Sequence, residues 1–119
     1  MHIIYVEDDP SNVALVERVV HMGQDRLTTY ASAEDAARDI WPGDADLILM
    51  DIDFRGGMNG LELTQMLRER GVTTPIIAIT AYDLKEYVHW AQQVGNDDFV
   101  VKPVNVPDLL SLLDFYRPA

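Results

Sequence analysis

The chain has 119 residues, of which 48% are hydrophobic and 24% are charged, and it contains no cysteine. This length and composition are typical of one globular domain, and the absence of cysteine excludes disulfides and thiolate metal sites. Twenty acidic against nine basic side chains give a formal charge of −11, which repels nucleic-acid phosphates, so we expect protein partners and no direct nucleic-acid binding.

The sequence shows no sign of a membrane segment or of a secretory signal. Its apolar runs are far shorter than the roughly 20 residues that a membrane-spanning helix needs. The start Met1-His2-Ile3-Ile4 lacks the basic region and the long apolar core of a signal peptide. We therefore expect a cytoplasmic protein that does not bind membranes. We also expect residues 1–119 to form one domain without an attached output domain.

Short apolar runs without polar alternation recur along the chain, as expected of strands that are covered on both faces. They lie at 3–6, 47–50, 76–79 and 99–101, with a weaker run at 27–30. Segments with helical start and stop signals lie between them. This alternation predicts an α/β fold in which a doubly wound sheet of five parallel strands carries five helices on its two faces.

The helical segments are bounded by residues that commonly begin and end helices. The predicted boundaries are Asp9 to Gly23, Ser32 to Trp41, Gly60 to Gly71, Asp83 to Gly95, and a last helix that begins at Asn105 or Pro107. This last helix has an unusually broad apolar face, made of Leu109, Leu110, Leu112, Leu113 and Phe115.

Polar side chains follow four of the predicted strands, at the point where each strand ends. They are Glu7 with Asp8, then Asp51, then Thr80 and then Lys102. The carboxyl ends of parallel strands meet at one edge of the sheet, which is where such sheets bind ligands. Carboxylates favour a hard cation, and a hydroxyl and an ammonium suit phosphoryl oxygens. The grouping therefore predicts a magnesium-dependent phosphoryl acceptor site.

The carboxylates of Glu7, Asp8 and Asp51 are expected to crowd together if their strands are neighbours. Crowding raises the pKa of a carboxylate unless a cation enters, and oxygen ligands without histidine or cysteine favour Mg²⁺. Asp51 follows a buried strand directly, which positions it as a nucleophile that can attack phosphorus and form an acyl phosphate. The alternative is a helix cap with solvated acids, and Asp9 before Pro10 is read as such a cap.

Thr80 and Lys102 are weak signals when each is taken alone. Thr80 is equally compatible with a local hydrogen bond to the backbone, and Lys102 with an ordinary surface charge. Lys102 precedes Pro103, and a cis bond between them would direct the ammonium back across the sheet. We take that cis bond as a hypothesis.

Taken together, three motifs resemble the receiver domain of two-component response regulators over essentially the whole chain. They are 6–10 (VEDDP), 47–52 (LILMDI) with 59–63 (NGLEL), and 80–81 (TA) with 100–103 (VVKP). The resemblance implies the flavodoxin-like strand order 2-1-3-4-5, for which a receiver is itself a standard example. It also implies a stand-alone receiver whose role is signalling, and which catalyses nothing beyond its own phosphorylation and slow dephosphorylation.

The resemblance implies a role for each site residue. Asp51 would accept phosphate from a sensor histidine kinase or a histidine phosphotransfer protein. Asp8 and Asp51 would ligate Mg²⁺ directly, Glu7 would do so through water, and the backbone carbonyl of Asp53 would complete the set.

It further implies a conformational switch. Thr80 and Lys102 would hold the phosphoryl oxygens, and inward movement of the Thr80 hydroxyl would let Phe99 turn from solvent to core. A downstream protein would read the change on the surface of the fourth helix, fifth strand and fifth helix. A homodimer is also possible. Asp53 and Tyr82, two residues after Asp51 and Thr80, are expected to tune the lifetime of the acyl phosphate.

Two departures from the family pattern and two other functions remain open. The stretch 53–59 lacks the usual proline and is one residue longer, and Phe99 stands where tyrosine is commoner. One alternative is a degenerate receiver that acts as a phosphorylation-independent interaction module. The other is a haloacid-dehalogenase-like phosphatase, because 51–53 is a D-x-D sequence; that family, however, places further acidic residues after its lysine.

Overall fold

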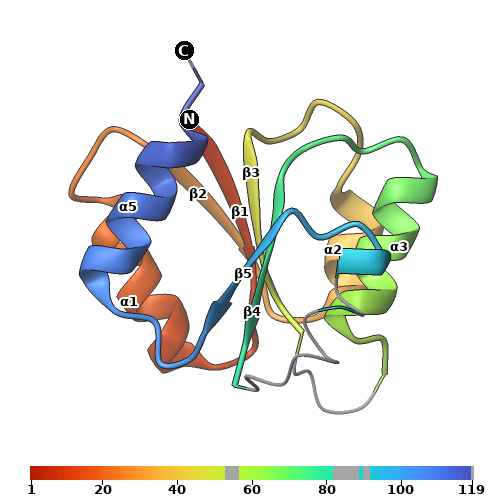
Figure 1. Ribbon diagram of the computed structural model, residues 1–119, viewed down its shortest axis with the longest axis horizontal. Helices are drawn as coiled ribbons and strands as arrows, with labels where there is room; N and C mark the ends of the chain where they lie inside the picture. The colour runs from red at the N-terminus through yellow and green to blue at the C-terminus, as the bar shows by residue number, and fades with distance from the viewer. Residues whose placement is uncertain (53–56, 82–88, 90–91, 119) are drawn as a thin grey trace.

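The computed structural model describes residues 1–52, 57–81, 89 and 92–118. Its centre is a parallel sheet in the order β2-β1-β3-β4-β5, with α1 and α5 on one face and α2 and α3 on the other (Figure 1). The strands are β1 (His2–Val6), β2 (Arg26–Tyr30), β3 (Leu47–Asp51), β4 (Ile76–Thr80) and β5 (Asp98–Val101). The helices are α1 (Pro10–Val20), α2 (Ala33–Asp39), α3 (Gly60–Glu69) and α5 (Val106–Tyr116). The predicted flavodoxin-like order is therefore confirmed, while the helix predicted at 83–95 lies largely outside the described residues.

The sheet separates two hydrophobic cores, because successive side chains of a strand point to opposite faces. Both neighbours of β3 and β4 are strands and both faces are covered, so every residue of these two strands is buried. The core under α2 and α3 includes Ile4, Ile48, Met50, Leu63 and Leu67. The core under α1 and α5 includes Ile3, Tyr5, Leu49, Leu109 and Leu113.

The helices begin at capping side chains, which satisfy backbone N–H groups that have no partner within the helix. Asp9 caps α1 and Ser32 caps α2, as predicted. Asn105 caps α5, which decides between the two predicted starts. Asn59 forms a reciprocal capping box with Glu62 at the start of α3, and the sequence analysis did not identify this box.

The broad apolar face of α5 is divided between core and solvent. Leu109 and Leu113 are buried, whereas Leu110 is 37% exposed and Phe115 is 78% exposed. One helix packed on a flat sheet can bury a single stripe, so the rest of a wider apolar face must point away from it. This face therefore presents hydrophobic surface to solvent.

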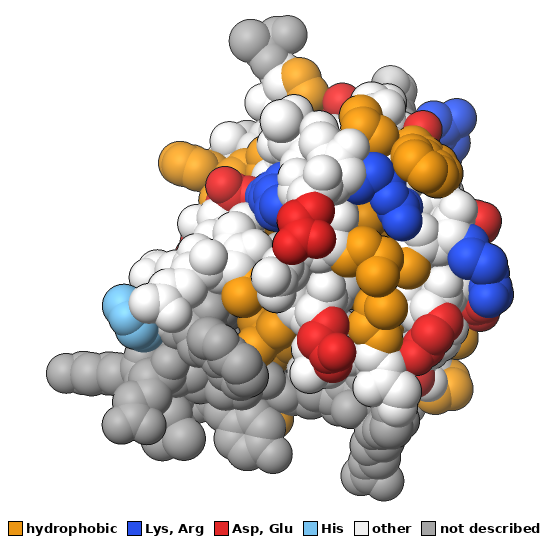
Figure 2. All heavy atoms as spheres, turned by 90° about the vertical axis from the view of Figure 1, so that its right-hand side faces the viewer, with side chains coloured by type: hydrophobic (Ala, Val, Ile, Leu, Met, Phe, Trp, Pro, Cys, Tyr) orange, Lys and Arg blue, Asp and Glu red, His pale blue; other side chains and the backbone are white. Residues whose placement is uncertain are grey.

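The opposite side of the molecule, formed by α2 and α3, carries acidic and basic side chains together around a strip of hydrophobic ones (Figure 2). Among the described residues, no helix combines the length and the apolar character needed to cross a lipid bilayer.

Candidate functional site

Five of the predicted site residues come together at the carboxyl edge of the sheet, the lower edge in Figure 1: Glu7, Asp8, Asp51, Thr80 and Lys102. Glu7 and Asp8 directly follow β1, and Asp51 is the last residue of the neighbouring strand β3. Thr80 ends β4 and pairs in register with Val101 of β5, so Lys102 begins the loop beside it. The strand order thus places the carboxyl ends of β1, β3, β4 and β5 next to one another at the same edge of the sheet.

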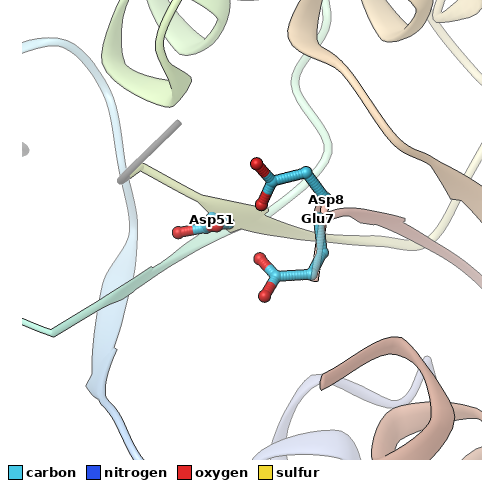
Figure 3. Close-up of side chains that lie close together, drawn as sticks. All are labelled: Glu7, Asp8 and Asp51. Carbon is cyan, nitrogen blue, oxygen red and sulfur yellow. The ribbon is translucent and has the colours of Figure 1, made fainter. Parts of the chain in front are cut away.

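Three carboxylates form a cluster at this edge. One oxygen from each of Glu7, Asp8 and Asp51 lies within 4.8 Å of the others. Figure 3 shows the three carboxylate groups pointing to the same side of the strand ends. Glu7 and Asp51 are buried and Asp8 is exposed, so the cluster opens to solvent on the side of Asp8.

The buried carboxylate of Glu7 has surroundings that disfavour its ionised form. The side-chain amide of Asn12 donates to its Oε1, while its Oε2 is buried without a hydrogen-bond partner among the described residues. Burial first, and then the neighbouring carboxylate of Asp51, raise the pKa of Glu7 from 4.5 to about 8, against the opposing effects of Asn12 and Lys102. An ionised Glu7 therefore needs more positive charge than the described side chains supply.

Lys102 supplies one positive charge to the cluster. Its Nζ lies 3.3 Å from Asp51 Oδ1 and 3.6 Å from Glu7 Oε1. Its backbone N–H donates to the carbonyl of Thr80 at 2.6 Å, which ties it to the end of β4. The Lys102-Pro103 bond is cis, as hypothesised. The ordinary surface-charge interpretation of Lys102 is therefore wrong.

Thr80 and Phe99 lie on the adjacent strands β4 and β5, with Phe99 two positions further from the carboxyl edge. Thr80 is buried at the end of β4. Phe99 pairs in register with Ala78 and is half-buried against the core under α2 and α3. It therefore occupies a position between solvent and core in this structure.

The described residues between β3 and α3 make close contacts on both sides of the segment 53–56. The first residue of α3, Gly60, packs so closely on β3 that a Cβ there would lie 2.4 Å from the carbonyl oxygen of Asp51. Met58 N–H donates to Glu34 Oε1 of α2 at 2.6 Å, and this bond lowers the pKa of Glu34. Gly57 has φ +62, which favours glycine.

Several predicted residues lie outside the described part of the chain, and others were not predicted at all. Asp53 and Tyr82 are outside it, as is the cap predicted at Asp83. The sequence analysis did not single out Asn12 or Glu34. Asn12 carried a usable signal, since it lies in the first turn of a helix that begins directly beside the acidic pair; Glu34 meets the loop through tertiary packing alone.

The chemistry of this donor set fits a small divalent cation. All the clustered ligand atoms are carboxylate oxygens, and a buried oxygen of Glu7 has no partner among the described residues. Mg²⁺ prefers such oxygen ligands and keeps several of its waters, which suits a cluster that is open on the side of Asp8. Asp51 is buried at the end of a rigid strand, yet its carboxylate lies within this cluster. The arrangement can hold a cation beside an anchored carboxylate nucleophile.

Comparisons with known proteins agree on one family. A family model of the response regulator receiver domain matches residues 3–114. The polar-differentiation response regulator DivK of Brucella ovis is 32% identical over 119 residues, covering 96% of this chain and 94% of that protein. Two-component system protein A of Emericella nidulans is 33% identical over 115 residues, covering 94% of this chain.

Some of these relatives are much longer than this chain. It spans 17% of the Emericella protein, and it spans 44% of the transcriptional regulatory protein TcrA of Mycobacterium tuberculosis, to which it is 29% identical.

Solved structures show the same fold. A chemotaxis protein of Vibrio cholerae, 24% identical, superposes with a TM-score of 0.88 over 98% of each chain. The BeF3-activated receiver domain of DrrB, 25% identical, superposes with a TM-score of 0.85 over 97% of this chain and 95% of that one.

Proposed function

The chain belongs to the family of response regulator receiver domains, the phosphoacceptor switches of two-component signalling, and we propose that Asp51 is its phosphoacceptor. The observation that carries this proposal is the surroundings of Asp51. It is buried at the end of β3, its carboxylate lies in the three-carboxylate cluster, and Lys102 Nζ is 3.3 Å from its Oδ1. We propose that residues 1–119 make up one receiver domain.

Receiver domains interact with histidine kinases or histidine phosphotransfer proteins, and we propose a phosphohistidine of such a protein as the donor. A carboxylate oxygen of Asp51 forms the new bond to phosphorus as the N–P bond of the donor breaks. The donor imidazole leaves with the electron pair of that bond and takes up a proton. The product is an acyl phosphate on Asp51, which water later hydrolyses.

Mg²⁺, held by Asp8, Asp51, Glu7 through water and the backbone carbonyl of Asp53, would neutralise negative charge on the transferring phosphoryl group. The chain's own residues do the rest. Burial of Asp51 fixes its position, which lowers the entropic cost of reaching an in-line geometry. Asn12 holds one oxygen of Glu7, so the orientation of that carboxylate is set before any cation binds.

Thr80 and Lys102 are proposed to bind the phosphoryl oxygens. The Lys102 ammonium now lies beside Asp51 Oδ1 and would bind an oxygen of the new phosphoryl group. The Thr80 hydroxyl would donate a hydrogen bond to a different phosphoryl oxygen. Movement of Thr80 would then let Phe99 turn inward from its half-buried position. A protein partner would read the change on β5, α5 and the segment at 83–95. We propose that Asp53 and Tyr82 tune the lifetime of the acyl phosphate.

The test is phosphorylation by acetyl phosphate in Mg²⁺, followed by intact-protein mass spectrometry. We expect the wild-type chain to gain one phosphoryl group and Asp51→Asn to gain none. Asp46→Asn is the matched control, because it makes the same change just before the opposite end of β3 and should label like wild type. Labelling of Asp51→Asn at the wild-type rate would refute the assignment.

The same assay separates the two alternatives. Absence of labelling in a folded wild-type chain would favour a degenerate receiver that serves as an interaction module. Rapid turnover of phosphate monoesters in Mg²⁺ would favour a haloacid-dehalogenase-like phosphatase. The proximity of the three carboxylates to one another and of Lys102 to Asp51 supports the phosphoacceptor.

A further inference from the structure

A groove of about 560 Å³ lies between the strand β5 and the helix α5. Among the described strands β5 pairs with β4 alone, so no described strand covers its outer edge. Most of the lining is hydrophobic, and the Phe115 ring packs edge-on against Tyr116 with ring centroids 4.9 Å apart. The described lining residues are Asp98, Phe99, Val100, Val101, Asp108, Ser111, Leu112, Phe115 and Tyr116.

The charge of this groove is one-sided. Asp98 and Asp108 both line it, and no lysine or arginine is among its described lining residues. The chain as a whole carries −11, so no distant positive field offsets these carboxylates. Electrostatic complementarity therefore favours an occupant with positive charge. A second copy of this chain would bring the same net charge of −11, which disfavours it as the occupant.

The backbone of the strand favours a helical occupant over an added strand. The N–H of Phe99 donates to the side chain of Asp98 at 2.8 Å, so one N–H of the edge strand is already occupied. β5 is also short, at four residues, which gives few positions for pairing. One wall of the groove is the exposed apolar side of α5, with Phe115 at its rim. Amphipathic helices bind grooves of this type through apolar anchors.

We propose that this groove binds an amphipathic helix of a protein partner, with lysine or arginine facing Asp98 and Asp108 and apolar side chains packed against Leu112 and Phe115. This inference rests on the proposed function in one respect: it assumes that the protein that supplies the helix is the output partner of the switch. Phe99 is among the lining residues and is also the proposed switch residue. Its partly buried side chain packs against the core on the other face of the sheet, so we expect the switch to reach the groove through the backbone of β5.

The probe is a fluorescent amphipathic helix of about 15 residues built from leucine and lysine, compared with its leucine and glutamate counterpart. Binding to the full chain is followed by anisotropy, with and without beryllofluoride and Mg²⁺. We expect the lysine peptide to bind, the glutamate peptide not to bind, and the affinity to differ between the two states.

Two pairs of variants locate the binding. Neutralising the groove with Asp98→Asn and Asp108→Asn is expected to lower the affinity for the lysine peptide about fivefold at low salt. Glu17→Gln with Asp39→Asn is the control, because it removes the same charge from exposed positions on α1 and α2. Phe115→Ala should weaken binding, whereas Leu110→Ala, on the same helix but outside the groove, should not.

Three results would overturn the inference. If the groove variants and the control variants lower the affinity for the lysine peptide equally, the peptide is attracted to the net charge of the chain alone. Absence of binding in both states, with Asp51 labelled normally by acetyl phosphate, would refute this partner while leaving the proposed function intact. Self-association that Phe115→Ala removes would show that a second copy occupies the groove. Conversely, groove-specific binding without Asp51 labelling would support the inference and refute the switch.

Discussion

At the scale of single residues, Glu7 links the acidic cluster to pH. Its pKa is about 8 in the folded chain, because of burial and of Asp51, against 4.5 for the free side chain. Between these values the folded state binds a proton that the unfolded state lacks. Without a divalent cation, the contribution of Glu7 to stability is therefore fully present below pH 4.5 and is lost as pH rises through about 8.

Glu7→Gln should remove this dependence. In EDTA, we expect the free energy of unfolding of the variant, relative to wild type, to increase between about pH 5 and about pH 9. Urea denaturation at both pH values measures this difference, and Mg²⁺ should stabilise wild type more at the higher pH. If the difference in free energy of unfolding between wild type and variant does not change with pH, the raised pKa of Glu7 is contradicted.

Glu34 is a residue whose role is visible only in the folded chain. Its carboxylate accepts the Met58 N–H bond that holds the loop after β3, and the pKa of Glu34 is lowered by that bond. Glu34→Ala should speed hydrogen exchange at the Met58 amide. It should also weaken Mg²⁺ binding, because Asp53, whose backbone carbonyl we propose as a ligand, precedes Met58 in the same connection between β3 and α3.

Glu34→Gln keeps an oxygen acceptor and is the matched control for Glu34→Ala, and amide exchange followed by NMR makes the comparison. Since the pKa of Glu34 is lowered in the folded chain, the contribution of this bond to stability is present above pH 4.5 and is lost as pH falls through the lower pKa of the folded state. Identical exchange in the two variants would show that the carboxylate does not hold the loop.

At the scale of elements, Arg68 joins the end of α3 to the loops that enter β4 and β5. Its guanidinium donates to the carbonyls of Gly95, Val72 and Thr74 and to the Asp97 carboxylate, at 2.8–3.1 Å. Its side chain is 23% exposed, so these bonds are partly shielded from water. Gly95 has φ +107, and a Cβ there would lie 2.9 Å from Arg68 Cγ. One side chain thus fixes the relative positions of three elements.

We expect Arg68→Ala to lower the free energy of unfolding by about 2–3 kcal/mol, because several carbonyls lose a charged donor. Arg38→Ala is the control: Arg38 is 70% exposed and pairs with Asp35 within α2, so its loss should cost under about 0.5 kcal/mol. Urea denaturation measures both. Equal midpoints for the two variants would show that the network does not stabilise the fold.

At the scale of the whole molecule, Asp25 joins the two ends of the chain, which lie close together in Figure 1. It accepts bonds from the Met1 amine at 2.8 Å and from Arg117 at 2.6 and 3.1 Å, and its side chain is 5% exposed. The Arg117 hydrogen bond is the first cause that lowers the pKa of Asp25 below 3.8, with the Met1 amine adding to it. β1 and α5 are thereby held to the loop before β2.

Asp25→Asn should destabilise the fold at neutral pH by about 1 kcal/mol. Because the pKa of Asp25 is lowered in the folded state, its contribution is present above 3.8 and is lost as pH falls through the lower folded value. The difference in melting temperature between wild type and variant should therefore shrink in acid. Asp114→Asn is the control, because the Asp114 side chain is 77% exposed and its carboxylate lies 3.5 Å from Arg117. This change should leave stability nearly unchanged both at neutral pH and in acid.

The sequence by itself determined the sheet, because its strands are continuous apolar runs and its helices carry local capping signals. It also determined the grouping of Glu7, Asp8, Asp51, Thr80 and Lys102, since the carboxyl ends of parallel strands necessarily share one edge. These are consequences of local pattern and of topology, and both can be read along the chain.

The tertiary structure alone decided the contacts that depend on how elements pack in space. The Glu34 bond to Met58, the Arg68 network and the Asp25 link join residues far apart in sequence, and no periodicity specifies which side chains meet. Packing also decided which part of the apolar face of α5 is buried and which part lines the groove beside β5. The physical reason is that burial depends on the curvature and spacing of neighbouring elements, which the sequence of one element does not contain.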